Sequence, residues 1–360
     1  MYVYIHIPFC NCICSYCDFC KILYNNNYID NYLSNLEKEI RSRYKGEIIK
    51  SIYIGGGTPS SLSLSELERL FNVIKIFNID DKYEFTIECN VDSLDIDKIK
   101  LFNKNKVNRI SLGVQSFNEE VLNILNRKHS YKEVNNVINN LKDNNINNIN
   151  IDLIYGVTDN IDIVKKDIDY FLSLDIPHIS CYSLIIEDNT ILSINNYKNI
   201  DEDAEYEMYK YIENKLESSG YIHYEISNYA KEGYSSIHNI NYWNNGEYYG
   251  FGLGSVSYLD NYRITNTRNI NKYNSGVYIS NKEYEDEYIR MSNDMILGLR
   301  KLNGVSISNF YNKYKKDIRE VFCIDDLIKD KLLIIDNDNI YINKKNLYLS
   351  NEMLIRFMIN

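Results

Sequence analysis

The chain carries near its N-terminus the stretch Tyr4-Ile5-His6-Ile7-Pro8-Phe9-Cys10-Asn11-Cys12-Ile13-Cys14-Ser15-Tyr16-Cys17, a β-type run that leads into closely spaced cysteines. Cys10, Cys14 and Cys17 form a Cys-x3-Cys-x2-Cys array. Thiolates are the usual ligands of iron–sulfur clusters. Three of them can hold three irons of a [4Fe–4S] cluster and leave the fourth iron without a protein ligand. Such a cluster can bind S-adenosylmethionine (SAM) and pass it one electron, so the spacing predicts radical chemistry or descent from a radical enzyme.

The alternative for these thiols is a structural zinc site. Zinc normally takes four ligands in two separated pairs, and no partner pair follows this compact group of cysteines. Of the eight cysteines, five lie within residues 10–20, which in a reducing compartment indicates metal ligation rather than a disulfide framework. Cys12 and Cys20 compete for the ligand assignment, and we expect both to be free thiols.

Composition limits the possible partners and locations. At 360 residues with 44% hydrophobic content, the chain can form one large α/β domain and a smaller one. The net charge of −10 argues against a nucleic-acid partner, which would need clustered Lys and Arg. No run of about 18 apolar residues could span a bilayer, and no apolar leader precedes the cysteines. We expect a cytoplasmic protein.

Short β-branched runs alternate with segments of helical period, which is typical of βα units and a parallel sheet. The expected strands are Tyr2–Ile7, Ser51–Ile54, Glu84–Cys89, Arg109–Val114, Asn150–Ile154 and His178–Leu184. The expected helices are Ile29–Tyr44, Leu64–Phe77, Ile96–Asn103, Glu119–Leu125 with Tyr131–Asn144, Ile163–Leu174 and Glu202–Ser218. Six units predict an α/β fold with an open, partial (β/α)6 barrel over residues 1–227, which ends near the run Tyr221–Ile226.

The last third of the chain has a different pattern. Residues 228–281 are rich in Gly, Asn and Tyr with little periodicity, which predicts an extended loop region across the open face of the barrel. Residues 282–360 predict a small helical, winged-helix-like domain: helices over Tyr284–Leu302 and up to Lys316, then two short strands within Leu332–Asn343. Winged helices often bind DNA, but the acidic balance favours a structural or docking role here.

Several polar residues follow the expected strands where a barrel site would form. Gly55-Gly56-Gly57-Thr58-Pro59 follows the second strand, and its glycines would let the backbone bond the methionine amine of SAM. Glu88, Gln115 and Asp152 interrupt apolar runs and suit the ribose hydroxyls. Arg127 could neutralise the SAM carboxylate. Each of these residues alone could equally be a turn, cap or surface residue.

A further motif is the string His238-Asn239-Ile240-Asn241-Tyr242-Trp243, which contains the only tryptophan. A neutral imidazole beside aromatic rings suits haem iron and a porphyrin face. The alternative is an ordinary hydrogen-bonded loop histidine.

Together these motifs resemble the radical SAM family of oxygen-independent coproporphyrinogen III oxidases, including its branch of haem chaperones. The likeness covers nearly the whole chain. The matching strings are His6–Cys10, Cys17–Phe19, Gly55–Pro59, Gly113–Phe117, Asp152–Gly156, Tyr224–Asn228 and His238–Trp243. By matching position, the resemblance implies that Cys10, Cys14 and Cys17 bind the [4Fe–4S] cluster. It places SAM against Tyr4, Gly56, Gly57, Thr58, Glu88, Gln115, Arg127 and Asp152. In the chaperone branch the His-Asn-x-x-Tyr-Trp string is associated with haem, which implies that His238 binds haem as cargo.

The resemblance leaves two functions open. The leading hypothesis is a chaperone that binds haem and delivers it to acceptor haemoproteins, including membrane-bound respiratory ones, with peripheral membrane association. The cluster and SAM would then serve assembly or release rather than turnover. The alternative is an oxidase that decarboxylates two propionates of coproporphyrinogen III to give protoporphyrinogen IX. A third possibility, an unrelated radical SAM reaction, would leave the His238–Trp243 string without a role.

Two features favour the chaperone branch. The oxidases have a segment ahead of the first strand and a further cysteine two places after the trio, whereas here the first strand begins at Tyr2 and that position is Phe19. One feature departs from the family. Its Gly-rich string usually ends in Gly-Ala-His-Ser, but this chain has Val256 in place of the histidine. Haem affinity would then be reduced or carried by His238 alone.

Overall fold

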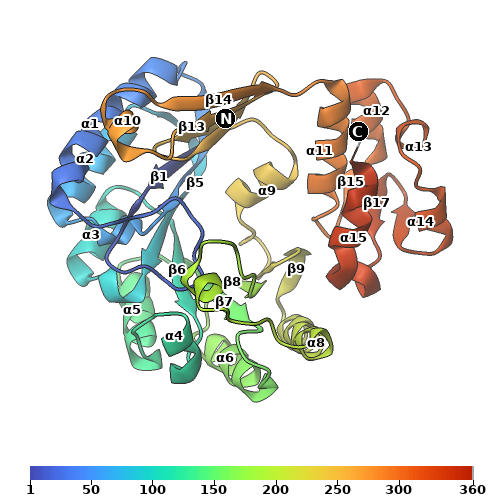
Figure 1. The fold of residues 1–360 in the computed structure, drawn as a ribbon, viewed down its shortest axis with the longest axis horizontal. Coiled ribbons are helices and arrows are strands. Elements are labelled where there is room, and N and C mark those ends of the chain that lie inside the picture. The colour runs from blue at the N-terminus through green and yellow to red at the C-terminus, as the bar shows by residue number, and fades with distance from the viewer. Residues whose placement is uncertain (359–360) are drawn as a thin grey trace.

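The computed structural model describes residues 1–358, and its centre is a nine-stranded sheet that curves into an open barrel (Figure 1). The strand order is β11 (Tyr249–Phe251), β1 (Tyr2–Ile7), β4 (Ile48–Gly56), β5 (Asn78–Asn90), β6 (Arg109–Gln115), β7 (Asn148–Tyr155), β8 (His178–Ser183), β10 (Asn228–Ala230) and β9 (Ile222–Glu225). Neighbours from β11 to β8 pair in parallel, and β10 and β9 continue the sheet antiparallel. The predicted partial barrel of six βα units is confirmed.

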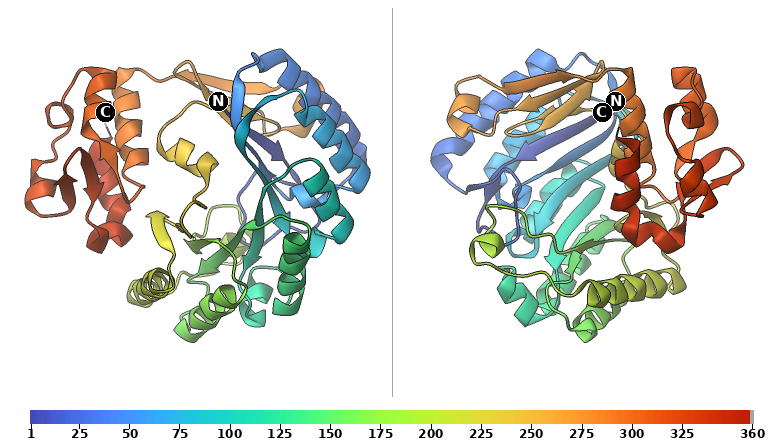
Figure 2. Two further views of the ribbon diagram at one scale, coloured as in Figure 1. Left: turned by 180° about the vertical axis from the view of Figure 1, so that it is seen from behind. Right: turned by 45° about the vertical axis from the view of Figure 1, so that its right-hand side comes forward.

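Helices cover the outer face of this sheet (Figures 1 and 2). They are α1 (Asn26–Arg43), α2 (Leu64–Ile74), α3 (Ile96–Lys104), α4 (Glu119–Ile124), α5 (Tyr131–Asp143), α6 (Ile161–Ser173) and α8 (Glu202–Ser218), and the short α7 (Ile191–Ile194) lies in the connection before α8. Local sequence fixes where they begin: α2 and α5 start with capping boxes, Ser63 with Glu66 and Ser130 with Glu133.

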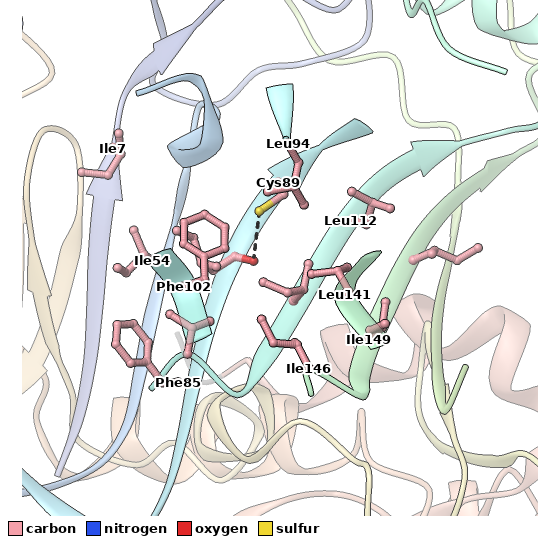
Figure 3. Packing of buried hydrophobic residues seen from close by; sticks show 14 of the residues in the cluster. Ile7, Ile54, Phe85, Cys89, Leu94, Phe102, Leu112, Leu141, Ile146 and Ile149 are labelled. Atoms are coloured by element: carbon pink, nitrogen blue, oxygen red, sulfur yellow. Dashed lines mark hydrogen bonds between the residues drawn. The ribbon is translucent and has the colours of Figure 1, made fainter. Parts of the chain in front are cut away.

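The two faces of the barrel strands have opposite character. Outward side chains such as Ile54, Phe85, Leu112 and Ile149 pack against Phe102 and other residues of the outer helices (Figure 3). Inward side chains alternate with these along each strand and are largely polar. The apolar core therefore lies between sheet and helices, and the lumen of the barrel can hold polar groups.

The expectation of a loop region over residues 228–281 is wrong in its secondary structure. This segment contains β10, α9 (Ile237–Trp243), β11, and a three-stranded sheet of β12 (Val256–Leu259), β13 (Tyr262–Asn266) and β14 (Ile279–Tyr284), with α10 (Ile270–Asn274). Because β11 pairs with β1, the main sheet extends beyond residue 227. Strands this short show no periodicity of their own, and their pairing partners are distant in sequence. The domain boundaries stay a prediction.

The C-terminal part forms a second core beside the open side of the barrel (Figure 1). It contains α11 (Glu287–Gly298), α12 (Ile307–Tyr314), α13 (Ile318–Val321), α14 (Asp325–Lys329), α15 (Ser350–Leu354) and the sheet β15 (Val305–Ser306), β17 (Asn339–Ile342), β16 (Leu333–Asp336). The predicted helices and the two short strands around residues 336–338 are present. Backbone bonds from Leu302 N to Tyr224 O and from Ile226 N to Arg300 O tie this part to the barrel. Over the described residues, no helix combines the length and apolar character needed to cross a membrane.

Candidate functional site

A cavity of about 970 Å³ opens within the barrel. Its lining comes from the cysteine loop, the Gly-rich turn after β4, the inner faces of β5 to β8 and residues 347–352 of the C-terminal part. Ligand pockets typically have volumes of about 300–1,000 Å³. The cavity is therefore large enough for a substantial ligand and is shared by both parts of the chain.

The cysteine loop lies between the paired strands β2 (Phe9–Cys10) and β3 (Ile22–Leu23). Cys10, Cys14 and Cys17 all line the cavity. The Thr58 hydroxyl donates to Cys10 Sγ at 3.5 Å, and Arg127 Nη1 donates to Cys14 Sγ at 3.7 Å. Burial raises the pKa of Cys10 to about 11 and also raises the pKa of Cys17. Bound iron would offset this penalty, because it carries the positive charge that stabilises thiolates.

The donor set fits the predicted cluster better than zinc. Within residues 1–358, no three His, Cys, Asp or Glu side chains stand close enough to hold a single metal ion. The three thiols border a common space instead. A four-iron cluster has its irons at alternate corners of a cube, so each thiol would bind a different iron. Cys12 also lines this space, where its Sγ accepts from Asn126 Nδ2 at 3.3 Å. Cys20 does not line it and lies against Gly254.

The Gly-rich turn needs its glycines for close packing. A Cβ at Gly55 would stand 2.8 Å from Glu88 Cδ, and a Cβ at Gly57 would stand 2.8 Å from Cys10 Sγ. Gly56 has φ +119°, a left-handed conformation that favours glycine, and its N–H donates to Glu88 Oε2 at 3.0 Å. The turn thus joins the cysteine loop to the inner face of β5.

Glu88 and Asp152 lie on the inner faces of β5 and β7 and line the cavity. Glu88 Oε1 accepts from the Tyr53 hydroxyl at 2.8 Å, and Asp152 Oδ1 accepts from Asn150 Nδ2 at 2.9 Å. Burial raises the pKa of Glu88 to about 7 and also raises the pKa of Asp152. Both side chains can accept hydrogen bonds from ligand hydroxyls when they are ionised.

Gln115 and Arg127 complete the predicted polar set near the cysteine loop, and both line the cavity. Gln115 ends β6 with φ 68°, an uncommon left-handed conformation for a residue other than glycine. Arg127 Nη2 donates to Gly113 O at 2.6 Å. The structure therefore brings together Gly56, Gly57, Thr58, Glu88, Gln115, Arg127 and Asp152 around one cavity.

Two predicted ligand-binding residues do not line the cavity. The Tyr4 hydroxyl pairs with His6 Nδ1 at 3.0 Å. His238 is 1% exposed, with Nδ1 3.0 Å from Ser51 Oγ and Nε2 2.9 Å from the Tyr242 hydroxyl. Burial, with a smaller effect of the Arg109 charge, lowers the pKa of His238 to about 3.

His238 is therefore a neutral, fully hydrogen-bonded histidine in this structure, as the alternative interpretation of the string expected. Its position on α9 offers no free nitrogen to a haem iron. Haem ligation by His238 stays a prediction, and it requires one of these two hydrogen bonds to break. Val256, where the family usually has histidine, begins β12 and does not line the cavity either.

Sequence reasoning missed several cavity residues. Inward positions that it did not single out include Tyr53, Arg109, Ser111, Asn150 and Ser180. The two-residue alternation along the expected strands could have found three of them: Arg109 and Ser111 counted back from Gln115, and Asn150 counted back from Asp152. It also missed an apolar rim, which we define as Phe19, Ile185 and Leu349; their side chains border the cavity and are 63%, 66% and 51% exposed.

Comparison with protein-family models defines the class. The Radical SAM superfamily model matches residues 4–168, and the HemN C-terminal domain model matches residues 290–349. The solved structure of coproporphyrinogen III oxidase (HemN) from Escherichia coli has a similar fold, with a TM-score of 0.88, 21% identity, and coverage of 99% of this chain and 89% of that chain. This is a radical SAM protein with a HemN-type C-terminal domain.

Full-length relatives narrow the assignment. The chain is 39% identical to heme chaperone HemW of Lactococcus lactis over 99% of this chain and 97% of that protein. It is 34% identical to heme chaperone HemW of Bacillus subtilis over 99% and 98%, and 33% identical to that of Escherichia coli over 78% and 77%. The chain belongs to the HemW family. The predicted resemblance to the chaperone branch is confirmed.

Proposed function

We propose that this chain is a haem chaperone, which binds haem in the barrel cavity and transfers it to acceptor haemoproteins. The observation that carries this proposal is the 39% identity to heme chaperone HemW of Lactococcus lactis over nearly the full length of both chains. The cavity supports it, because a polar interior lies behind the apolar rim. Haem likewise has an apolar part and a polar part: a flat ring that could contact the rim and two carboxylates that could reach the polar interior.

The residues around the cavity also suit the cofactors of a radical SAM protein. Cys10, Cys14 and Cys17 would hold a [4Fe–4S] cluster, which supplies one electron to SAM when both are bound. The Thr58 hydroxyl steadies Cys10 through its hydrogen bond to Sγ. Arg127 carries the positive charge that would pair with the SAM carboxylate.

The remaining polar residues would orient the nucleoside. Glu88 and Asp152 present carboxyl oxygens for the ribose hydroxyls, while Gly56 and Gly57 let the backbone approach the methionine amine. In this arrangement SAM occupies the end of the cavity near the cysteine loop. Ile185 and Leu349 of the apolar rim and the rest of the lumen are then free for haem.

Haem binding in the cavity does not require His238, whose two ring nitrogens are both hydrogen-bonded. The acceptors are proposed to be haemoproteins, including membrane-bound respiratory ones that the chain would approach as a peripheral partner. A cytoplasmic location agrees with that role.

The experiment that tests this function uses the full chain, reconstituted anaerobically with iron and sulfide. One sample is titrated with haem and followed by absorbance. A second receives SAM, dithionite and coproporphyrinogen III, and is analysed for 5′-deoxyadenosine and porphyrin products. We expect saturable haem binding and no protoporphyrinogen. Substrate-dependent 5′-deoxyadenosine with protoporphyrinogen would identify an oxidase, and absence of haem binding would reject the chaperone.

A further inference from the structure

Arg109 is a buried cation without a partner. It is the first residue of β6, it is 2% exposed, and it ranks among the largest fully buried side chains of the described residues. Over residues 1–358, its guanidinium has no carboxylate within 4 Å and no side-chain hydrogen bond, and Nε is buried without an acceptor. A charge removed from water in this way is costly unless a counter-charge meets it.

The nearby carboxylates do not supply that counter-charge. Burial raises the pKa values of Glu88 and Asp152, and the positive charge of Arg109 offsets only a small part of that rise. Their carboxylate oxygens are occupied by other donors. Glu88 accepts from the Tyr53 hydroxyl and Gly56 N, and Asp152 accepts from Asn150 Nδ2 and Ser111 Oγ. Arg109 is thus not part of a closed ion pair within the barrel.

Arg109 instead lines the cavity, on the same inward face of β6 as Ser111 and Gly113. Its planar guanidinium presents several N–H donors in a fixed fork, a geometry that matches a carboxylate in two parallel hydrogen bonds. A carboxylate that enters the cavity would accept a hydrogen bond from Arg109 Nε and would also neutralise the buried charge.

Two ligands of this site carry carboxylates, SAM and haem. Arg127 already stands at the cysteine loop, where Nη1 contacts Cys14 and Nη2 contacts Gly113 O. Gly113 lies four residues along β6 from Arg109, a separation of roughly 13 Å in an extended strand. Arg109 therefore begins β6 at the end opposite Gln115 and Gly113, where the SAM carboxylate would lie, and a ligand whose carboxylate reaches Arg109 extends along the lumen.

We propose that Arg109 binds a propionate carboxylate of haem. The inference rests on the proposed haem-chaperone function and deepens it, because it states which chain residue recognises the polar edge of the cargo. The apolar rim would contact the ring, and Arg109 would hold the carboxylate inside the barrel.

The test compares haemin with haemin dimethyl ester, in which both propionates are blocked, on the full chain with its cluster reconstituted. Dissociation constants are measured for wild type, Arg109→Gln, Arg109→Lys and Arg41→Gln, whose arginine lies on the surface of α1 with its side chain 61% exposed. SAM binding is measured for the same proteins and for Arg127→Gln. These arms separate the two possible sources of the carboxylate.

We expect Arg109→Gln to weaken haemin binding by about ten- to a hundredfold, the range for a hydrogen bond to a charged group. The ester should bind wild type and Arg109→Gln equally, Arg109→Lys should retain part of the discrimination, and Arg41→Gln should match wild type. SAM binding should survive Arg109→Gln and weaken in Arg127→Gln. The inference is overturned if Arg109→Gln affects haemin and the ester alike, affects neither, or weakens SAM instead.

Two readouts keep this test decisive. Wild type that binds no haemin rejects the proposed function itself, whereas wild type that binds haemin and ester equally rejects only the role of Arg109. Thermal unfolding of the ligand-free proteins separates a structural role. Because Arg109 has no partner to lose, Arg109→Gln should unfold at the wild-type temperature or above it, and a marked fall would assign Arg109 to the scaffold.

Discussion

Single residues in the barrel lumen set the charge of the site. Glu88 has a pKa of about 7 in the folded chain, above its ordinary value of 4.5, because burial disfavours the ionised form. Between these two pH values the folded state binds more protons than the unfolded state. The stabilising contribution of Glu88 is thus fully present below its unfolded pKa and is lost as pH rises through the folded pKa.

We therefore expect Glu88→Gln to remove a pH-dependent loss of stability that wild type shows. Across this pH range, the difference in unfolding free energy between wild type and Glu88→Gln should change by up to about 3 kcal/mol, because one pKa unit corresponds to 1.36 kcal/mol. Urea unfolding of both proteins at a series of pH values measures it, with Glu68→Gln, an exposed glutamate of α2, as the control. A gap between wild type and Glu88→Gln that stays constant with pH would contradict the argument.

Gly57 provides a second residue-scale test. In Gly57→Ala the new Cβ would stand 2.7 Å from Pro8 C and 2.8 Å from Cys10 Sγ, so the cysteine loop must shift. We expect about 1–3 kcal/mol of destabilisation from overpacking and a marked fall in iron per chain after reconstitution. Gly233→Ala is the control, because its Cβ would meet no atom within 4 Å and only its positive φ causes strain. Equal iron contents in the two variants would contradict the packing argument.

The residues that sequence could predict are those whose chemistry is local. The cysteine spacing, the glycine string and the polar strand ends identified seven cavity residues besides the three thiols. His238 shows the limit of such reasoning. Nothing in its own string reveals that Ser51, almost two hundred positions earlier, occupies one ring nitrogen. Arg109 was likewise missed, because the absence of a partner is a property of the folded lumen.

At the scale of elements, a carboxylate of β5 attaches the N-terminus of α9 to the barrel. The Glu84 carboxylate is 4% exposed and accepts from Ile237 N and His238 N, both at 3.0 Å, and from Ser236 Oγ at 3.3 Å. A helix of only seven residues has little stability of its own, so this buried contact fixes its position.

Glu84→Gln should therefore destabilise the chain by about 1–3 kcal/mol, since a neutral amide offers one acceptor where the carboxylate offers two. The matched control is Glu133→Gln in the exposed capping box of α5, where glutamine serves almost as well as glutamate. Chemical denaturation compares the two variants. If the two variants lose the same amount of unfolding free energy, Glu84 does not anchor α9.

The elements also differ in how far sequence could predict them. The six barrel strands and their helices were predictable because apolar periodicity and capping boxes are local signals. Strand β11 was not, because it has three residues and exists through its pairing with β1. The sheet β12–β14 was missed for the same reason: its short strands stabilise one another across turns rather than through a periodic pattern.

At the scale of the whole molecule, the C-terminal part lies beside the barrel (Figure 2). Each of the two has its own apolar core, and both contribute residues to one cavity. The cysteine loop contributes Phe19 to one side of the rim, and the C-terminal part contributes Leu349. The C-terminal part thus forms part of the cavity lining. The structural or docking role expected for it stays a prediction.

Leu349→Ser tests this contribution. We expect haem affinity to fall by about three- to tenfold, because a half-exposed leucine would lose part of the 1.5–3 kcal/mol that full burial provides. SAM affinity should not change. Ile355→Ser, also in the C-terminal part and 64% exposed but outside the cavity lining, is the control. Parallel losses in the two variants would show that the rim is not the haem surface.

Haem transfer tests the central claim most directly. Reconstituted chain loaded with haem is mixed with an apo-haemoprotein, and the absorbance spectra of donor and acceptor are followed together. The account predicts that the acceptor fills as the donor empties, faster than from an equal amount of free haem. Haem that stays on the chain, or that reaches the acceptor no faster than free haem does, would contradict it.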